Sequence, residues 1–186
     1  GHIGVVTLFG KVYDNPLYEG LNVVNPLVKV TNMSTQVLKH QGKYDAASKD
    51  LQAVHVEMVI NYRLTPAKAP AIFQRVGKDY VSVIIDPAAQ EVLKANTALH
   101  IASEILYKRP EIKNDVQEKL AVWLAKYGIE TTEVALANIR FNPDYEKAIE
   151  TKQIEQQKAD QKLYELTQAQ RSADIAVAKA RGEADA

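Results

Sequence analysis

The sequence predicts an α+β fold: a small, mostly antiparallel sheet with packed helices, followed by one long C-terminal helix. Strand-like segments of alternating polarity dominate the first third of the chain, and a similar segment returns near residue 129. Oxygen-bearing residues followed by proline mark helix starts after residue 64, and the composition after Pro143 shifts to helix-favouring Ala, Gln, Lys and Glu. We therefore expect a strand-rich part over residues 1–65, a helix-rich part over 66–142 and the start of a long coiled-coil helix over 143–186.

The first part should hold several short strands. Residues 4–9 are strand-like, and Val28–Leu38 is β-branched and alternating, with a phase shift typical of a bulge. The clearest strand covers residues 54–64. Its apolar face carries Val54, Val56, Met58, Ile60, Tyr62 and Leu64, and its polar face carries His55, Glu57, Asn61 and Arg63. One buried face and one face open to water or a partner favour an antiparallel sheet.

The second part should hold helices that begin at cap and proline pairs. Thr65-Pro66, Asp86-Pro87 and Asn142-Pro143 each place an N-cap residue before a proline that needs no N–H bond. The first helix should end at Gly77 with Ile72, Phe73 and Val76 inward, and the second should run from Pro87 toward Tyr107 with Val92, Leu93, Leu99, Ile105 and Leu106 as its apolar set.

A third helix and a strand should close this part. The helix should start near Pro110, end at Gly128, and carry Ile112, Val116, Leu120, Trp123, Leu124 and Tyr127 inward. Residues 129–141 return to strand chemistry, with Val134 and Leu136 on one face and Ile139 and Phe141 on the other. This change of face implies a bulge or an edge twist.

The predicted helix after Pro143 would extend about 64 Å at 1.5 Å per residue, too long to pack on so small a domain along its whole length. Its sparse apolar residues mostly recur every three or four positions, which predicts a seam for packing against copies of itself or a paralogue. The expected oligomer interface comprises Ile154, Leu163, Leu166, Ala169, Ala173, Ala176 and Ala180. A solvated, single charged helix is the alternative, and the pattern does not separate a dimer from a large ring.

The first thirty residues are unusually apolar for connections so rich in turns. Ordinary core packing would explain this. The alternative is contact with a bilayer surface or with the next subunit. For that second case, the expected membrane-proximal residues are Phe9, Leu17, Tyr18, Leu21, Val24 and Leu27.

Composition excludes several classes of protein. The chain has 186 residues, 46% of them hydrophobic, which is enough for a folded core, and its 23 basic and 23 acidic residues give no overall attraction to nucleic acid. No cysteine is present, so disulfides and thiolate chemistry are absent. Apolar runs are too short to span a membrane. Because neither end looks natural, we expect a fragment whose flanks were removed.

Reactive motifs are also missing. His2 is terminal, His40 lies in a turn-like stretch, His55 is on the polar face of a strand and His100 is within a helix, and none has metal-site spacing to another. There is no nucleophile elbow and no glycine-rich phosphate loop. The acidic pair Glu111 and Asp115 lies among lysines and is explained as solvated helix charge. We therefore expect no catalytic residue, no metal and no cofactor.

Several short segments, spread over essentially the whole chain, form a specific combination. They are residues 1–6, Phe9-Gly10, residues 19–21 with Pro26, Ser48-Lys49-Asp50 before the 54–64 strand, Lys108-Arg109, Leu120, Tyr127-Gly128-Ile129, Asn138-Ile139 and residues 148–157. Together they resemble the stomatin/prohibitin/flotillin (SPFH, band-7) family, the prohibitin branch in particular. Gln90 before Glu91, and Glu155 after Ile154, depart from the family pattern, and the second departure prevents direct transfer of a prohibitin seam register.

The resemblance implies a non-enzymatic scaffold that is held by an N-terminal anchor in a bacterial plasma membrane or the mitochondrial inner membrane. It implies assembly into large rings or cages that organise membrane microdomains and restrain a membrane-bound AAA+ protease. The expected partners are thus the chain itself or a paralogue, a membrane surface and such a protease. The alternative is a soluble holdase or adaptor that binds clients through the helical tail, and a hydrolase is the third hypothesis.

Overall fold

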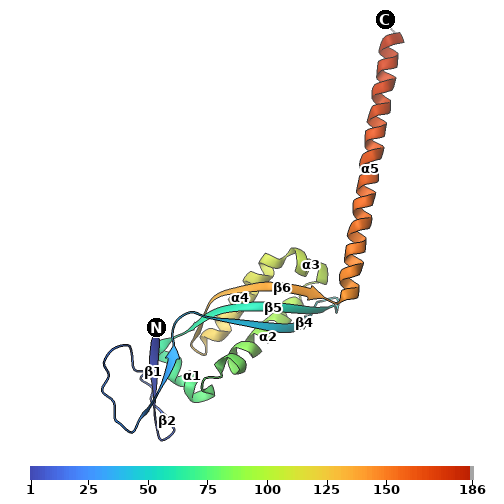
Figure 1. Cartoon of the computed structure of the whole chain (residues 1–186). Helices are drawn as coiled ribbons and strands as arrows, with labels where there is room; N and C mark the ends of the chain where they lie inside the picture. Colours follow the sequence, from blue (N-terminus) through green and yellow to red (C-terminus); the bar gives the residue numbers. More distant parts are fainter. Residues whose placement is uncertain (185–186) are drawn as a thin grey trace. The chain divides into compact units, whose positions relative to one another are not determined.

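The computed structural model describes residues 1–184 and divides the chain into two compact units. The first unit, Gly1–Phe141, contains two small antiparallel sheets and four α-helices, and the second begins at Asn142 and contains one long helix (Figure 1). The predicted α+β class, with a long C-terminal helix, is confirmed.

The smaller sheet is built from the N-terminal strands β1 (His2–Leu8), β2 (Lys11–Val12) and β3 (Lys29–Ser34), in the order β2-β1-β3. Its buried side chains are Ile3, Val5, Val6 and Met33, and helix α1 packs beside it. The single strand predicted over Val28–Leu38 is wrong. Thr35 instead donates its N–H to the Gly1 carbonyl at 2.9 Å, and the chain leaves the first sheet here to enter the second.

The larger sheet has the order β4-β5-β6, with β4 (Leu38–Ala47), β5 (Ala53–Leu64) and β6 (Ile129–Phe141). His40 therefore lies in a strand and not in a turn. The alternation predicted for residues 54–64 is confirmed, because all six apolar residues of that strand are buried under the helices. Each of the two edge strands pairs with β5 along almost its whole length.

Strand β6 contains two bulges that keep its apolar side chains on one face. Its register against β5 shifts at Ala137 and at Thr132, which have no partner across the ladder. The predicted bulge is confirmed, and as a result Phe141 shares the buried face with Val134 and Leu136 instead of opposing them. The Arg109 guanidinium donates to the carbonyls of Leu136 and Ala137, and thus satisfies main-chain oxygens that the bulge leaves outside the ladder.

The helices of the first unit follow the predicted order, with corrected boundaries. A 3-10 turn and a π-helical turn accompany four α-helices: η1 (Pro66–Lys68), α1 (Ala69–Val76), η2 (Val81–Ile85), α2 (Asp86–Thr97), α3 (Ala102–Tyr107) and α4 (Arg109–Ala125). Gly77 and Gly128 end their helices with φ of 65° and 81°, as their glycine identity predicts.

Two of the predicted helix starts are wrong in detail. Asp86 is not an N-cap but is itself helical, because η2 runs into α2 without a break, and its carboxylate receives bonds from the neighbouring strand. Thr65 is extended before Pro66, as predicted, but its side chain makes no capping bond.

The single helix predicted over residues 87–107 is also wrong. The chain turns between α2 and α3, where the carbonyls of Asn96 and Thr97 accept bonds from Leu99 and His100. The N–H of Ala102, at the start of α3, donates to the Asp50 carboxylate at 2.9 Å. An aspartate from a distant turn therefore takes the place of a local N-cap.

The core lies between α2, α4 and one face of the larger sheet, with α2 against β4 and α4 against β6 (Figure 1). Ile112, Val116, Leu120 and Leu124 of α4 are buried, as predicted. Four residues predicted to point inward are exposed instead: Leu99, Leu106, Trp123 and Tyr127. These four lie at helix ends or beside the buried stripe, where the helix turns away from the sheet.

Helix α5 (Pro143–Ala184) confirms the predicted long helix, and residues 185 and 186 of that prediction lie outside the described part. Asn142 caps it, because its side-chain oxygen accepts the Asp144 N–H at 2.9 Å. None of the helices formed by the described residues has both the length and the apolar composition needed to cross a membrane.

Candidate functional site

The N-terminal sheet presents an aromatic residue at the tip of its hairpin. Phe9 and Gly10 form the two-residue connection between β1 and β2, with φ of 48° and 86°. Glycine adopts such a backbone without cost, whereas phenylalanine does so only with strain. The Phe9 side chain is 90% exposed, so it makes almost no packing contact that would offset this strain. A strained, exposed aromatic residue marks a position to examine for function.

The segment between β2 and β3 exposes a second group of apolar side chains. The Asn22 side-chain amide donates to the carbonyls of Tyr18 and Gly20, and the Asn25 side-chain oxygen accepts the Leu27 N–H. These bonds order the loop from within, while its apolar side chains point outward. The exposed residues are Tyr18, Leu21, Val23, Val24 and Leu27, of which Leu21 and Val23 have no cover at all.

Leu17 differs from the other predicted membrane-proximal residues because it is half-buried. Its backbone N–H and C=O both bond to Gly4 of β1, at 2.8 and 2.9 Å, and so hold the loop against the sheet. Next to it is a groove of about 450 Å³ whose apolar lining includes Val6, Leu8 and Val28. Leu17 therefore packs beneath this surface. The other predicted membrane-proximal residues form its exposed side: Phe9, Tyr18, Leu21, Val24 and Leu27. We call those five residues together with Val23 the N-terminal apolar surface.

Helix α5 exposes every predicted interface residue. From residue 150 to residue 181 all side chains are exposed. In its second half, Leu166, Ala169, Ala173, Ala176 and Ala180 follow one another after three and four residues in turn, the spacing that places side chains along one helix face. Ile154 and Leu163 lie outside this regular stretch. Tyr164 and Ile175, which the sequence analysis did not select, are exposed too, because large apolar residues on this helix do not all follow one period.

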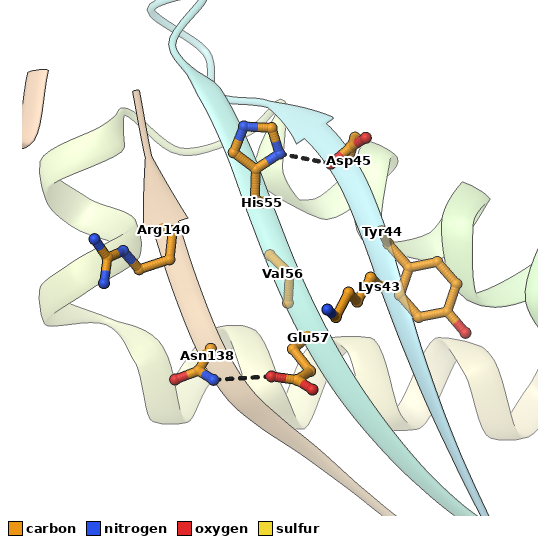
Figure 2. Close-up of a pocket in the computed structure, with 8 residues that line it drawn as sticks. All are labelled: Lys43, Tyr44, Asp45, His55, Val56, Glu57, Asn138 and Arg140. Carbon is orange, nitrogen blue, oxygen red and sulfur yellow. Dashed lines mark hydrogen bonds and ion pairs between the residues drawn. The ribbon is translucent and has the colours of Figure 1, made fainter. Parts of the chain in front are cut away.

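The uncovered face of the larger sheet carries polar side chains from all three strands (Figure 2). They line a shallow pocket of about 350 Å³, in which His55 lies 2.6 Å from Asp45 and Asn138 donates to Glu57 at 2.8 Å. The pKa of Glu57 is lowered, because Asn138 and then Gln41 donate hydrogen bonds to its carboxylate. Pairing between side chains of neighbouring strands thus explains why these polar groups lie close together.

A half-buried cluster joins β4 to α2. The Tyr44 hydroxyl donates to Asp86 at 2.7 Å, and His40 Nε2 lies 2.7 Å from the same carboxylate oxygen. Burial, followed by the bond to Asp86, raises the pKa of the Tyr44 hydroxyl above its usual range. The cluster is explained by its role in fixing α2 on the sheet.

The histidines are placed apart from one another. His40 and His55 pair with Asp86 and Asp45, and His100 lies 3.6 Å from Glu104 in the next helical turn. Within residues 1–184, no three His, Asp or Glu side chains lie close enough together to hold a metal ion. The described residues also expose large apolar side chains on the N-terminal apolar surface and on α5.

Comparison with known proteins gives these surfaces a family context. Residues 1–184 match the family described as SPFH domain / Band 7 family. Prohibitin-4, mitochondrial, from Arabidopsis thaliana is 27% identical over 96% of this chain and 64% of its own length. Prohibitin-1 from Saccharomyces cerevisiae is 30% identical over 76% of this chain and 49% of its own length. Prohibitin 1 from Gallus gallus is 31% identical over 100% and 69% respectively. The chain thus spans about half to two thirds of the length of the curated relatives it matches.

Proposed function

This chain belongs to the SPFH domain / Band 7 family, and from that premise we propose that it is a non-enzymatic, membrane-associated scaffold. Copies of the chain, or of the chain and a paralogue, assemble side by side into large rings or cages. The similarity to prohibitins over most of its length supports a scaffold role.

The exposed seam of α5 carries this proposal. A helix of 42 residues with Leu166 and a row of alanines on one face gains little from burial within its own unit, because its side chains are exposed. Helices in water are stabilised mainly by packing of their apolar face. Alanines bring two backbones close together and leucine adds apolar area at about 25 cal/mol per Å². Lateral packing of α5 against other copies therefore stabilises both the helix and the assembly.

The N-terminal apolar surface is the proposed membrane contact. Phe9, Leu21 and Val23 stand fully or almost fully in water in the isolated chain. Moving such side chains into the bilayer interface is favourable by about 1.5 to 3 kcal/mol each when they become fully buried. Asn22 and Asn25 order the loop that carries Leu21 and Val23, and Phe9 lies in the tight turn between β1 and β2, so insertion requires no folding step.

The proposal includes the wider role that the family resemblance implies. The scaffold organises membrane microdomains and restrains a membrane-bound AAA+ protease, and an N-terminal anchor holds it in a mitochondrial inner membrane or a bacterial plasma membrane. The word "mitochondrial" in the name of one relative supports the first location.

Cross-linking of the full-length protein in membranes tests the proposal. A high-order ladder of cross-linked species is the expected result. If only monomers appear, or if the protein remains in the soluble fraction and binds unfolded clients through α5, the scaffold proposal is wrong and the adaptor hypothesis replaces it.

A further inference from the structure

The uncovered face of the β4-β5-β6 sheet carries its charges in rows that run across the three strands. The register aligns Lys39 with Asn61 and Glu133 at one end of the sheet. At the other end it aligns Asp45 with His55 and Arg140. Lys39, Asp45, Glu133 and Arg140 are all exposed, and Figure 2 shows Asp45 and Arg140 on the two outer strands of this face.

The two edges of this face carry opposite charges within each of these rows. The first row has Lys39 on β4 and Glu133 on β6, and the last has Asp45 on β4 and Arg140 on β6. The intermediate rows end in Gln41 and Ala135, or in Lys43 and Asn138. No row has the same sign at both ends, so the β4 edge of one copy complements the β6 edge of another when the rows are aligned.

The main chain of β6 is partly closed to a further strand. Gln117 of α4 accepts the Val134 N–H at 3.2 Å, and Arg109 donates to the carbonyl of Ala137 at 3.0 Å. Helix side chains thus occupy backbone groups that an added strand would need. Recognition at this edge consequently depends on side chains, and above all on their charge.

We infer that this face makes a second, head-to-tail contact between copies, in which the β4 edge of one copy lies beside the β6 edge of the next. Lys39 then faces Glu133, and Asp45 faces Arg140. A contact between two different patches repeats from copy to copy and produces a ring or an open filament, unlike a two-fold contact. The inference rests on the proposed scaffold function and adds to α5 a contact within the sheet domain.

A two-fold contact between two β4 edges is the competing arrangement, because it would place Lys39 opposite Asp45 of the other copy. The Gln90 side chain donates to the Asp45 carbonyl at 2.6 Å, at an end of the β4 edge that both arrangements use. The two-fold contact closes as a dimer and does not extend to further copies. The proposed ring therefore favours the head-to-tail arrangement, and the two make different predictions.

The absence of cysteine from the chain permits a direct test. The full-length protein is produced as two co-expressed variants, Lys39→Cys and Glu133→Cys, and its membranes are oxidised mildly. Disulfide-linked dimers that contain one copy of each variant are the expected result. Lys119→Cys with Glu133→Cys is the matched control, because Lys119 is an exposed lysine on α4, away from the β4 edge, and it should give at most a background level of dimer.

Charge reversal provides an independent readout. Lys39→Glu alone and Glu133→Lys alone should each reduce the cross-linked ladder, because like charges then face each other, whereas co-expression of the two variants should restore it. Lys119→Glu and Glu118→Lys, with the same charge changes on α4, should leave the ladder unchanged. High salt should weaken the restored contact by screening.

Three outcomes would overturn the inference. Efficient disulfides between Lys39→Cys and Asp45→Cys variants, with rescue of Lys39→Glu by Asp45→Lys in the same chain, would establish the two-fold contact. The ladder could also be normal while the Lys39→Cys and Glu133→Cys variants form no disulfide and charge reversal has no effect. The scaffold would then assemble through α5 without this contact. Monomers in the unmodified protein would instead reject the scaffold proposal itself, together with this contact.

Discussion

At the scale of single residues, Phe9 combines backbone strain with full exposure, and we expect its replacement to separate stability from membrane binding. Phe9→Asn should raise the free energy of unfolding by about 1 kcal/mol, because asparagine tolerates positive φ. The same change should weaken binding of the chain to lipid vesicles about tenfold or more, since an inserted phenylalanine contributes about 1.5 to 3 kcal/mol. Chemical denaturation and vesicle co-sedimentation measure the two effects.

Leu51 provides a matched control for this experiment. It is also a large apolar residue with positive φ, of 60°, and it is 86% exposed, but it lies in the turn between β4 and β5, outside the N-terminal apolar surface. Leu51→Asn should increase stability as Phe9→Asn does and leave vesicle binding unchanged. Equal losses of binding for the two variants would show that the N-terminal apolar surface is not the membrane contact.

Asp50 joins two distant segments and should make stability depend on pH. Its carboxylate accepts bonds from the Ser48 hydroxyl at 2.6 Å and from the Ala102 N–H at 2.9 Å, and these bonds, Ser48 first, lower its pKa. The unfolded chain then binds the proton more readily than the folded chain. The stabilisation is complete above the pKa of the unfolded carboxyl, about 3.9, and is lost as the pH falls through the lower folded value.

Asp50→Ala should therefore lower the free energy of unfolding at pH 7 by about 1 kcal/mol, the usual contribution of a helix N-cap. The difference from the unmodified chain should shrink below about pH 4, as the carboxyl is protonated in both states. Urea denaturation at several pH values measures this, with Asp115→Ala on the exposed face of α4 as control. A difference that is constant with pH would show that the carboxylate charge is not involved.

At the scale of elements, α5 should be necessary for assembly and unnecessary for the sheet domain. Leu166→Asp together with Ala173→Asp puts two charges on the predicted seam, and we expect assembly of the full-length protein to be lost while the first unit stays folded. Gln161→Asp with Gln168→Asp introduces the same charges at the same spacing on another face and should have little effect. Particle size, by light scattering or electron microscopy, measures both. Unchanged size in the first variant would place the seam elsewhere.

Local pattern was sufficient for some elements and insufficient for others. Strand β5 was predicted residue by residue, because a sheet with helices on one face imposes strict alternation on its central strand. The end of β3 at Ser34 and the early start of α2 were missed, since neither is marked by a strong breaker. The cap that Asp50 supplies to α3 lies 52 residues from Ala102, and no sequence window connects the two. The exposed interface residues were named from composition and periodicity, and they remain predictions.

At the scale of the whole molecule, the first unit should fold without the second. Its core is formed by its own sheets and helices, and the residues of α5 from 150 to 181 are exposed. Residues 1–141 alone should thus unfold cooperatively, with a midpoint within a few degrees of that of the chain, while losing the ability to form large particles. Calorimetry measures the first effect and size-exclusion chromatography the second. Loss of cooperative unfolding would show that α5 stabilises the sheet domain directly.

The family resemblance suggested by short segments is confirmed over residues 1–184. It succeeded where single motifs were weak, because the order and spacing of many small features were considered together. The same resemblance does not specify interface residues, because the register of α5 depends on which partner it packs against.

The boundary between Phe141 and Asn142 also bears on how such proteins diversify. Because each unit keeps its own internal contacts, recombination at this point can join the sheet domain of one family member to the helix of another without disturbing either fold. If α5 selects the assembly partner, as proposed, a lineage would thereby acquire a new partner in a single genetic event, and chimeras made at this junction would reassign subunit pairing in the laboratory.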